Sequence, residues 1–302
     1  MKNEKYLGRG IHSEKFIKAL ESGNLKPMLD LINTDKHSDL DVKIRNDYLN
    51  IYYKGGNIAK LRSENSIDFD KFYFCLEKDR SRNEILKDQA SMDKLKEKRD
   101  KLIKKFKTGD YAAYFSEAKV VMDAWLSEYN KPERTEQHQL SLENRYGQSD
   151  FTILDLEYEV SIQSAFACKL KAKNGKPKKP RFDIIAVDKE GKLCVIEFKK
   201  GSGALTGVSG LKEHYECFNH SIGLNPKPFM DEMKNLLKQK QSLNLIDKQV
   251  EIKSLAPEFM FAFAYDSNHK EREERLFERE YKKLNAAIHV IKLKEGSFKL
   301  LK

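Results

Sequence analysis

A carboxylate and an ammonium group stand two residues apart inside an apolar segment, LCVIEFK, at residues 193–199. A buried charge is costly unless it is paired or coordinated, so Glu197 and Lys199 require an explanation. Side chains alternate along a strand, which places Val195, Glu197 and Lys199 on one face. Either the segment is an edge strand whose polar face meets water, or the two charges belong to an active site.

A second carboxylate, Asp183, lies in the strand-like segment RFDIIAV at residues 181–187. The turn-like sequence DKEGK at residues 188–192 predicts that the two segments form a hairpin. In that hairpin Asp183 approaches Glu197 near the strand ends. Two carboxylates repel each other there unless a cation lies between them, and oxygen ligands suit Mg²⁺ or Mn²⁺. The residues therefore indicate a metal site, with Lys199 placed to hold a water or a phosphoryl oxygen.

The order of these residues, Asp183 followed by Glu197-Phe198-Lys199, resembles that of the PD-(D/E)xK nuclease superfamily. The resemblance covers residues 132–302, which follow the family order of a helix, a three-strand meander, a helix and a further strand. It implies hydrolysis of phosphodiester bonds that depends on Mg²⁺, with Mn²⁺ able to substitute. It also implies that Asp183, Glu197 and the Phe198 carbonyl ligate the metal, and that Lys199 orients or activates the attacking water.

The family often adds a glutamate from the first helix. Glu133, Glu136 and Glu143 all qualify, and the spacing to the following strand favours Glu136 as the additional catalytic residue. Phe182 stands where many members carry a proline. Two other interpretations stay open: the Asp and the Glu–Lys pair form an ion pair on the protein surface, or the fold is present without the activity.

The segment KLKAKNGKPKKPR at residues 169–181 is strongly basic and leads into the Asp183 strand. A basic loop beside the proposed site is suited to grip a nucleic-acid backbone, although it also fits a solvated loop. A second basic run, residues 96–107, fits phosphate contacts or a solvated helix face. The residues expected to bind nucleic acid are Lys171, Lys173, Lys176, Lys178, Lys179 and Arg181.

The composition points to the same class of partner. The chain of 302 residues has 57 basic and 47 acidic residues, and a net charge of +10 favours nucleic acid ahead of an anionic membrane. The four cysteines lack zinc-site spacing, and there is no P-loop. The sequence has no apolar signal region and no apolar run of membrane length, so we expect a cytoplasmic protein without a membrane partner. The oligomeric state stays open, a homo-oligomer included.

These elements predict an α/β protein. By the resemblance, residues 111–302 form a restriction-endonuclease-like mixed β-sheet flanked by helices, preceded by a small α+β module with a connecting helix in residues 1–110. That module should contain an antiparallel meander at residues 40–61, a strand near 69–75 and one long helix at 82–107. The leading hypothesis is a Mg²⁺-dependent nuclease with DNA as the expected substrate. The alternative is a non-catalytic nucleic-acid-binding or interaction protein on the same fold. His214, on a predicted helix, either faces the cleft or is structural.

Overall fold

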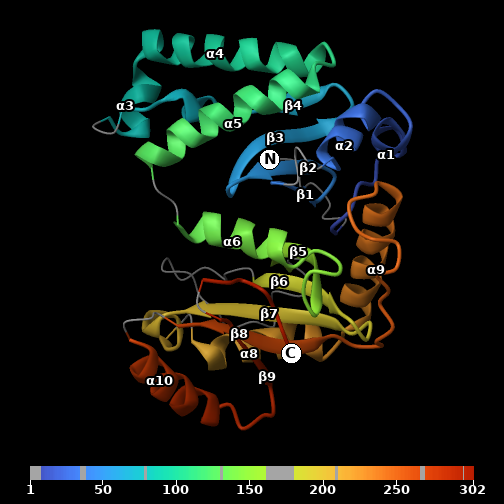
Figure 1. The fold of residues 1–302 in the computed structure, drawn as a ribbon, viewed down its shortest axis with the longest axis vertical. Helices are drawn as coiled ribbons and strands as arrows, with labels where there is room; N and C mark the ends of the chain where they lie inside the picture. Colours follow the sequence, from blue (N-terminus) through green and yellow to red (C-terminus); the bar gives the residue numbers. More distant parts are fainter. Residues whose placement is uncertain are drawn as a thin grey trace. The chain divides into compact units, whose positions relative to one another are not determined.

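The computed structural model describes residues 8–34, 39–77, 80–129, 132–160, 180–207, 210–265, 269–294 and 296–302, apart from the side chains of residues 132 and 133. The described chain divides into two compact units. Unit 1 is built mainly from Glu143–Lys238 and Ile246–Lys302, and unit 2 from Arg9–Leu142 and Gln239–Leu245. Each unit contains one β-sheet (Figure 1).

Unit 2 is organised around an antiparallel sheet in the order β1-β2-β3-β4. The helices α1 and α5 contact β3, and α2 and α4 contact α5. Ile51, Ala59 and Tyr114 are fully buried between these layers, and the Tyr114 hydroxyl donates to the Ile58 carbonyl. The strands are β1 (Leu40–Ile44), β2 (Leu49–Tyr53), β3 (Gly56–Ser63) and β4 (Ser66–Asp68); the helices are α1 (Glu14–Glu21), α2 (Lys26–Ile32), α3 (Arg82–Lys87), α4 (Gln89–Lys107), α5 (Tyr111–Glu128) and α6 (Pro132–Glu143).

The other face of this sheet is polar. Lys43, Asn50 and Lys60 are successive cross-strand partners and therefore share it. On the β1 side, α6 covers this face, because Lys43 Nζ donates to Ser141 Oγ at 2.8 Å and lies 3.1 Å from an Asp41 oxygen. The predicted boundary at residue 110 differs from this division, since α5 and nearly all of α6 pack within unit 2.

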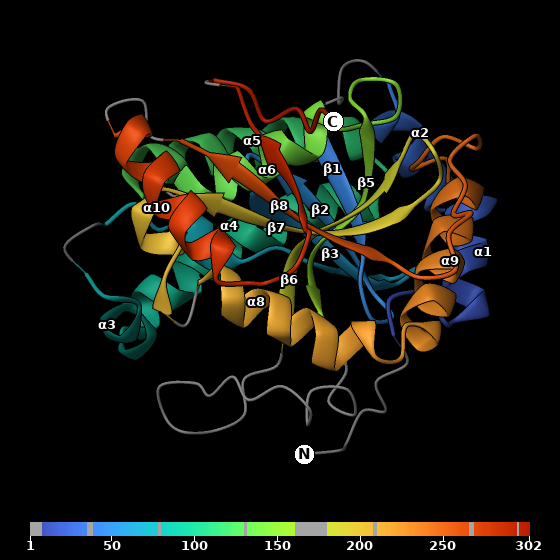
Figure 2. The ribbon, with the colours of Figure 1, turned by 90° about the horizontal axis from the view of Figure 1, so that it is seen from below.

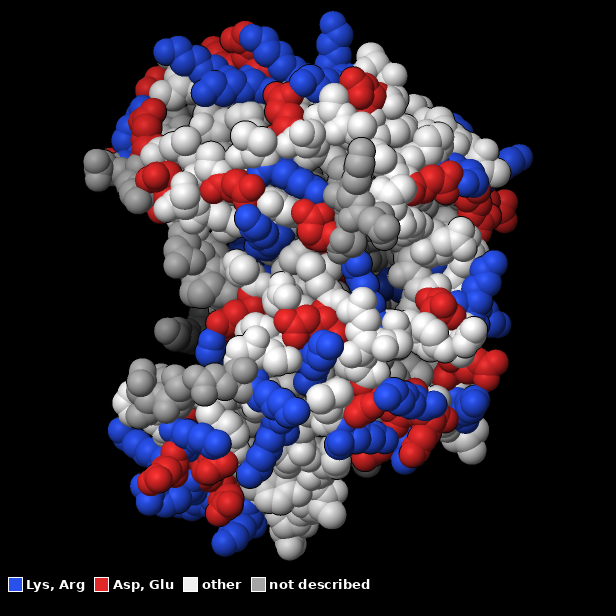
Figure 3. All heavy atoms as spheres, in the orientation of Figure 1, with Lys and Arg blue, Asp and Glu red and all other residues white. Residues whose placement is uncertain are grey.

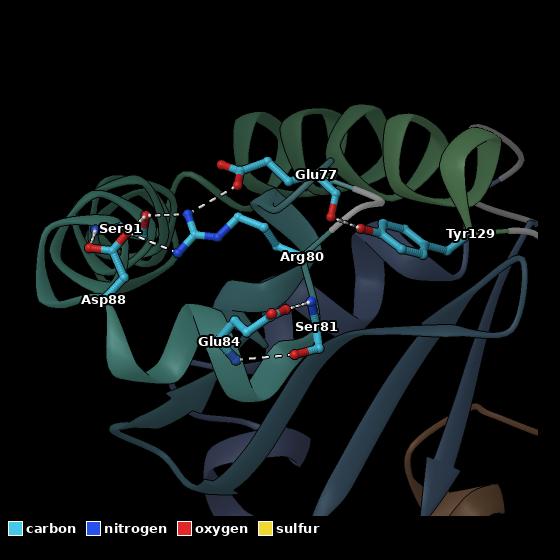
Figure 4. Close-up of polar contacts among 7 residues, drawn as sticks. All are labelled: Glu77, Arg80, Ser81, Glu84, Asp88, Ser91 and Tyr129. Atoms are coloured by element: carbon cyan, nitrogen blue, oxygen red, sulfur yellow. Dashed lines mark hydrogen bonds and ion pairs between the residues drawn. The ribbon is translucent and has the colours of Figure 1, made fainter.

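The predicted helix at residues 82–107 is two helices, with a break at Asp88 (Figure 4). Asp88 has an extended backbone, and its side chain caps α4 by accepting from the Ser91 amide. Arg80 stabilises the chain at the break, because its guanidinium donates to Asp88 at 2.9 Å and to Ser91 Oγ at 3.1 Å. The helical spacing of apolar residues continues through the break, so the sequence pattern did not predict it.

The strand predicted near residues 69–75 is wrong. A short strand, β4, precedes this segment, and the 3₁₀ helix η2 (Lys71–Phe74) occupies it. Asp70 initiates the 3₁₀ helix by accepting a hydrogen bond from the Phe72 amide at 3.0 Å. Phe72 and Phe74 then pack against a small core of Cys75, Ile85 and Leu95. The β-propensity of these aromatic residues favoured a strand. Their packing against α4 instead stabilises a 3₁₀ helix.

Unit 1 contains a mixed sheet in the order β5-β6-β7-β8-β9. The first three strands form the predicted antiparallel meander, and β8 and β9 add in parallel. The mixed α/β class predicted from the sequence is therefore confirmed, with strand positions within a few residues of those expected. The strands are β5 (Phe151–Glu159), β6 (Arg181–Asp188), β7 (Leu193–Lys200), β8 (Glu258–Ala264) and β9 (His289–Lys292).

Two helices of unit 1 lie over one face of this sheet, α8 (Leu211–Phe218) and α10 (Lys270–Lys282) (Figures 1 and 2). Phe277 of α10 contacts Phe261 and Phe263 of β8, which fixes the face that α10 covers. The division between the units falls inside the helix α9 (Lys227–Ser242). Among the described helices, none is both long enough and apolar enough to cross a membrane.

Gly55, in the β2–β3 turn, provides a test of how unit 2 is packed. Its φ is +79°, and a Cβ there would lie 2.3 Å from the Arg134 carbonyl oxygen at the start of α6. Gly109 is a matched control, because its φ is +82° but nothing lies within 4 Å of a Cβ. We expect Gly55→Ala to destabilise the protein by about 2–4 kcal/mol, since left-handed strain and steric overlap both contribute. Gly109→Ala carries the strain alone and should cost ~1 kcal/mol.

Denaturant unfolding of both variants measures the difference. Equal losses of stability in Gly55→Ala and Gly109→Ala would mean that α6 does not lie against this turn.

Candidate active site

The two charges in β7 lie in the middle of the sheet and not at its edge. β7 pairs with β6 on one side and β8 on the other, and Glu197 and Lys199 are 0% and 3% exposed. The interpretation of a solvated edge strand is therefore wrong. Glu197 pairs with Phe261 and Lys199 with Phe263, which places both charges on the face covered by α10. An apolar layer thus surrounds a buried Glu–Lys pair.

Asp183 meets this pair where β6 and β7 separate. The ladder between the strands ends at Ile184 and Ile196, so the next position of each strand places Asp183 opposite Glu197. Beyond the ladder the Phe198 amide has no strand partner in β6, and it donates to Asp183 Oδ2 at 3.0 Å. The two carboxyl groups are close enough that repulsion from Glu197 raises the pKa of Asp183. The structure therefore brings the two predicted carboxylates together beside the Phe198 backbone.

Two side chains contact the same oxygen of Glu197 and leave its other oxygen unused. His214 Nδ1 of α8 lies 2.8 Å from Glu197 Oε2, and Lys199 Nζ lies 3.5 Å from the same oxygen. The other oxygen, Oε1, is buried and has no hydrogen-bond partner among the described residues. A buried acceptor without a donor is costly, and such an atom often marks the position of a missing ligand.

The electrostatics of the pair favour a bound proton or cation. Burial and repulsion from Glu197 together raise the pKa of Asp183 to about 8, and attraction to Lys199 and His214 only partly opposes this rise. Burial also raises the pKa of Glu197, although Lys199 and hydrogen bonds from Asp183 oppose the change. Because the two carboxyl groups interact strongly, they take up and release protons as a pair. A divalent cation would replace the shared proton.

The donor set fits Mg²⁺. Among the described residues, no group of three or more His, Cys, Asp and Glu side chains is arranged to hold a metal. Mg²⁺ commonly uses only one or two carboxylates and completes its octahedral shell with waters and substrate phosphates. Asp183 and Glu197 supply two carboxylates, and the unpaired Glu197 Oε1 is a suitable ligand atom. The Phe198 carbonyl stays a predicted third ligand.

The other predicted residues are distributed differently. Glu136 lies half-buried on α6 in unit 2, and its catalytic role stays a prediction. Glu143 has a structural role, because it accepts from the Phe298 amide at 2.8 Å. Arg181 is exposed and lies 3.4 Å from Glu157. The predicted nucleic-acid-binding residues outside the described residues are Lys171, Lys173, Lys176, Lys178 and Lys179.

Two further residues belong to this region. The sequence left two positions open for His214, facing the cleft or structural. In the structure His214 contacts Glu197. Glu273 of α10 was missed; it is buried and accepts from the Ser202 amide at 3.1 Å, directly after β7. Its only sequence signal is a position four residues before the buried Phe277, within a charged helix. Glu273 fixes the turn that follows Lys199.

Comparisons of the chain with protein-family models, with curated proteins and with solved structures found no match. The chemistry of the site therefore rests on the geometry of its own residues.

The raised pKa of Asp183 predicts a pH-dependent gain in stability for Asp183→Asn. In the wild type, the folded state keeps a proton that the unfolded state releases above about pH 4, so stability falls as pH rises toward 8. Asn cannot ionise and escapes this loss. We expect Asp183→Asn to be more stable than wild type by ~2 kcal/mol or more at pH 7, with the difference vanishing near pH 4.

Asp150→Asn is the matched control, because a hydrogen bond from Lys189 lowers the pKa of Asp150. That variant should lose stability at pH 7. Urea unfolding of both variants at pH 4 and pH 7, without divalent metal, measures the two effects. A destabilised Asp183→Asn at pH 7 would contradict the contact between Asp183 and Glu197.

Proposed function

We propose that this protein is a metal-dependent nuclease that hydrolyses phosphodiester bonds, with DNA as the expected substrate. The observation that carries the proposal is the strand register that places two carboxyl groups, Asp183 and Glu197, opposite each other, with the Lys199 ammonium on the same face of a central strand. The mixed sheet of unit 1 adds support, because its antiparallel start β5-β6-β7 is followed by two parallel strands, as the resemblance implies.

Each residue has a distinct role in the proposal. Asp183 and Glu197 would hold Mg²⁺, and the unpaired Glu197 Oε1 is available as a ligand atom. When bound, Mg²⁺ supplies a Lewis acid that neutralises charge on the scissile phosphate. Lys199 Nζ donates to the attacking water or to a phosphoryl oxygen, which orients the water and stabilises the negative charge that develops. His214 acts through Glu197 as a positioning residue, because it contacts Oε2 and so fixes the carboxylate.

The proposal assigns Glu197 to the metal and Lys199 to the water or phosphate, so removing each side chain should have a different effect on metal affinity. Glu197→Gln keeps the shape of the side chain and removes its charge, so metal affinity and cleavage should fall together. Lys199→Ala should retain most of the metal affinity, because an ammonium cannot ligate a cation. Cleavage should still fall by about 10² or more, as for other groups that act on the transition state.

Calorimetric titration with Mn²⁺, beside cleavage of a labelled duplex and a labelled single strand in Mg²⁺, measures both quantities. Lys200→Ala is the matched control, because Lys200 is the next residue along β7 and its side chain is exposed. A cleavage rate of Lys199→Ala equal to that of the wild type would contradict the proposal. Nucleic-acid binding without cleavage by the wild-type chain would favour the non-catalytic alternative.

Metal affinity should depend on pH, because the cation must displace the proton that the pair shares. With the pKa of Asp183 at about 8, Mn²⁺ affinity should rise about tenfold per pH unit between pH 6 and pH 8 and level off above it. Titrations in two buffers of different ionisation enthalpy count the released protons directly. A constant affinity across this range, without proton release, would exclude binding of the metal at Asp183 and Glu197.

A further inference from the structure

A cationic cluster on the polar face of the unit 2 sheet is separate from the candidate active site. Tyr48, the residue before β2, has two cations against its ring: Lys60 Nζ lies 4.2 Å and Arg62 Cζ 5.4 Å from the ring centroid. Both cations come from β3 and share this ring, although the register of β3 with β4 shifts between Leu61 and Ser63. We call Tyr48, Lys60 and Arg62 the tyrosine cluster.

Neither cation of this cluster is neutralised in the described chain. Lys60 and Arg62 form no ion pair with any carboxylate of the described residues. Burial and repulsion from Arg62 lower the pKa of Lys60, although Asp68 partly opposes them. By contrast, Lys43, in the same cross-strand row, pairs with Asp41 and Ser141. Asp68 lies across the sheet from Lys60 but forms its ion pair with Arg99 at 4.0 Å, so neither cation of the cluster has a paired carboxylate. An anion from outside the chain would stabilise them.

A second observation on the same face points to a ligand. Asn50 pairs directly with Lys60 across the sheet and is 6% exposed. Its Nδ2 donates to the Tyr52 hydroxyl, but its Oδ1 is buried without a hydrogen-bond partner among the described residues. An unpaired amide oxygen beside unpaired cations suits a nucleic acid, whose phosphates are anionic and whose base amino groups can donate to the Asn50 oxygen.

We propose that the tyrosine cluster binds the sugar–phosphate backbone of a nucleic acid. Two residues along a strand span about 7 Å, which is close to the rise of two nucleotides along one strand of a duplex. Arg62 is exposed and Lys60 half-buried, so both can donate to phosphate oxygens. Unit 2 then holds the polymer that unit 1 cleaves. This inference concerns the partner of the proposed nuclease, and its experiment does not depend on cleavage.

Binding is measured by fluorescence anisotropy of labelled 20-nucleotide single strands and duplexes in EDTA, with the full chain carrying Glu197→Gln. In that background we expect Lys60→Ala with Arg62→Ala to weaken binding at least tenfold. Loss of two phosphate contacts should also lower the slope of log K against log salt by about 1.5. Arg62→Ala alone, at an exposed position, should give a smaller loss in the same direction and tests the site even if the double variant folds poorly.

The matched control removes the same charge elsewhere. Lys94→Ala with Lys98→Ala acts on α4, where both side chains are exposed and form no ion pair among the described residues. Basic side chains predominate over α4 at the top of Figure 3, so an effect of net charge alone would appear here equally. We expect less than a threefold change in this control. Equal losses in the two double variants would overturn the inference.

Two more outcomes separate the alternatives. Vesicles with anionic lipid, tested beside the oligonucleotides, should bind weakly and without dependence on Lys60 and Arg62; cluster-dependent vesicle binding stronger than oligonucleotide binding would overturn the inference in favour of a membrane surface. If the cluster variants lose oligonucleotide binding while the wild-type chain cleaves nothing in Mg²⁺, the inference stands and the nuclease proposal alone fails.

Discussion

The contact between Asp183 and Glu197 is the constraint to which the rest of unit 1 is adapted. Two carboxyl groups in contact within an apolar layer cannot both be ionised at low cost, so the folded chain needs a proton or a cation between them. The contact arises from the sheet itself. Antiparallel pairing of β6 and β7 places the two residues opposite each other, and the end of the ladder frees the Phe198 amide to hold Asp183. A shift of one residue in register would move one carboxylate to the other face.

The helices of unit 1 complete this arrangement. α8 supplies His214, which occupies one oxygen of Glu197, and α10 supplies the aromatic cover beside the charged residues. Glu273 of α10 accepts from the Ser202 amide, so the same helix also fixes the turn that leaves β7. Loss of water from the layer strengthens every charge interaction inside it. The layer that buries Glu197 and Lys199 is therefore also the main cause of the raised pKa of Asp183.

The two units differ in how they treat charge. Unit 1 concentrates carboxyl groups with one ammonium at the end of a central strand, which suits a cation and the chemistry of a phosphate. Unit 2 instead carries two cations on one tyrosine ring that form no ion pair with a carboxylate of the described residues, which suits a polyanion. One sheet would thus contribute reactivity and the other affinity. In the proposed function, affinity for the polymer would then not require unpaired cations within unit 1.

Local patterns in the sequence determined the elements that place the site. Alternation of apolar residues located β6 and β7 and set Asp183 and Glu197 on one face, because a two-residue period and a short turn leave little choice of register. The same reasoning failed at Asp88 and at residues 71–74, where side-chain caps and aromatic packing oppose the local preference. The contacts of His214 and Glu273 arise from α8 and α10, which are distant along the chain and carry no signal of their partner. Only the tertiary structure decided three further features: the burial of Lys199, the unpaired oxygen of Glu197 and the two cations on Tyr48. The physical reason is that desolvation and charge pairing depend on which surfaces are brought together in space.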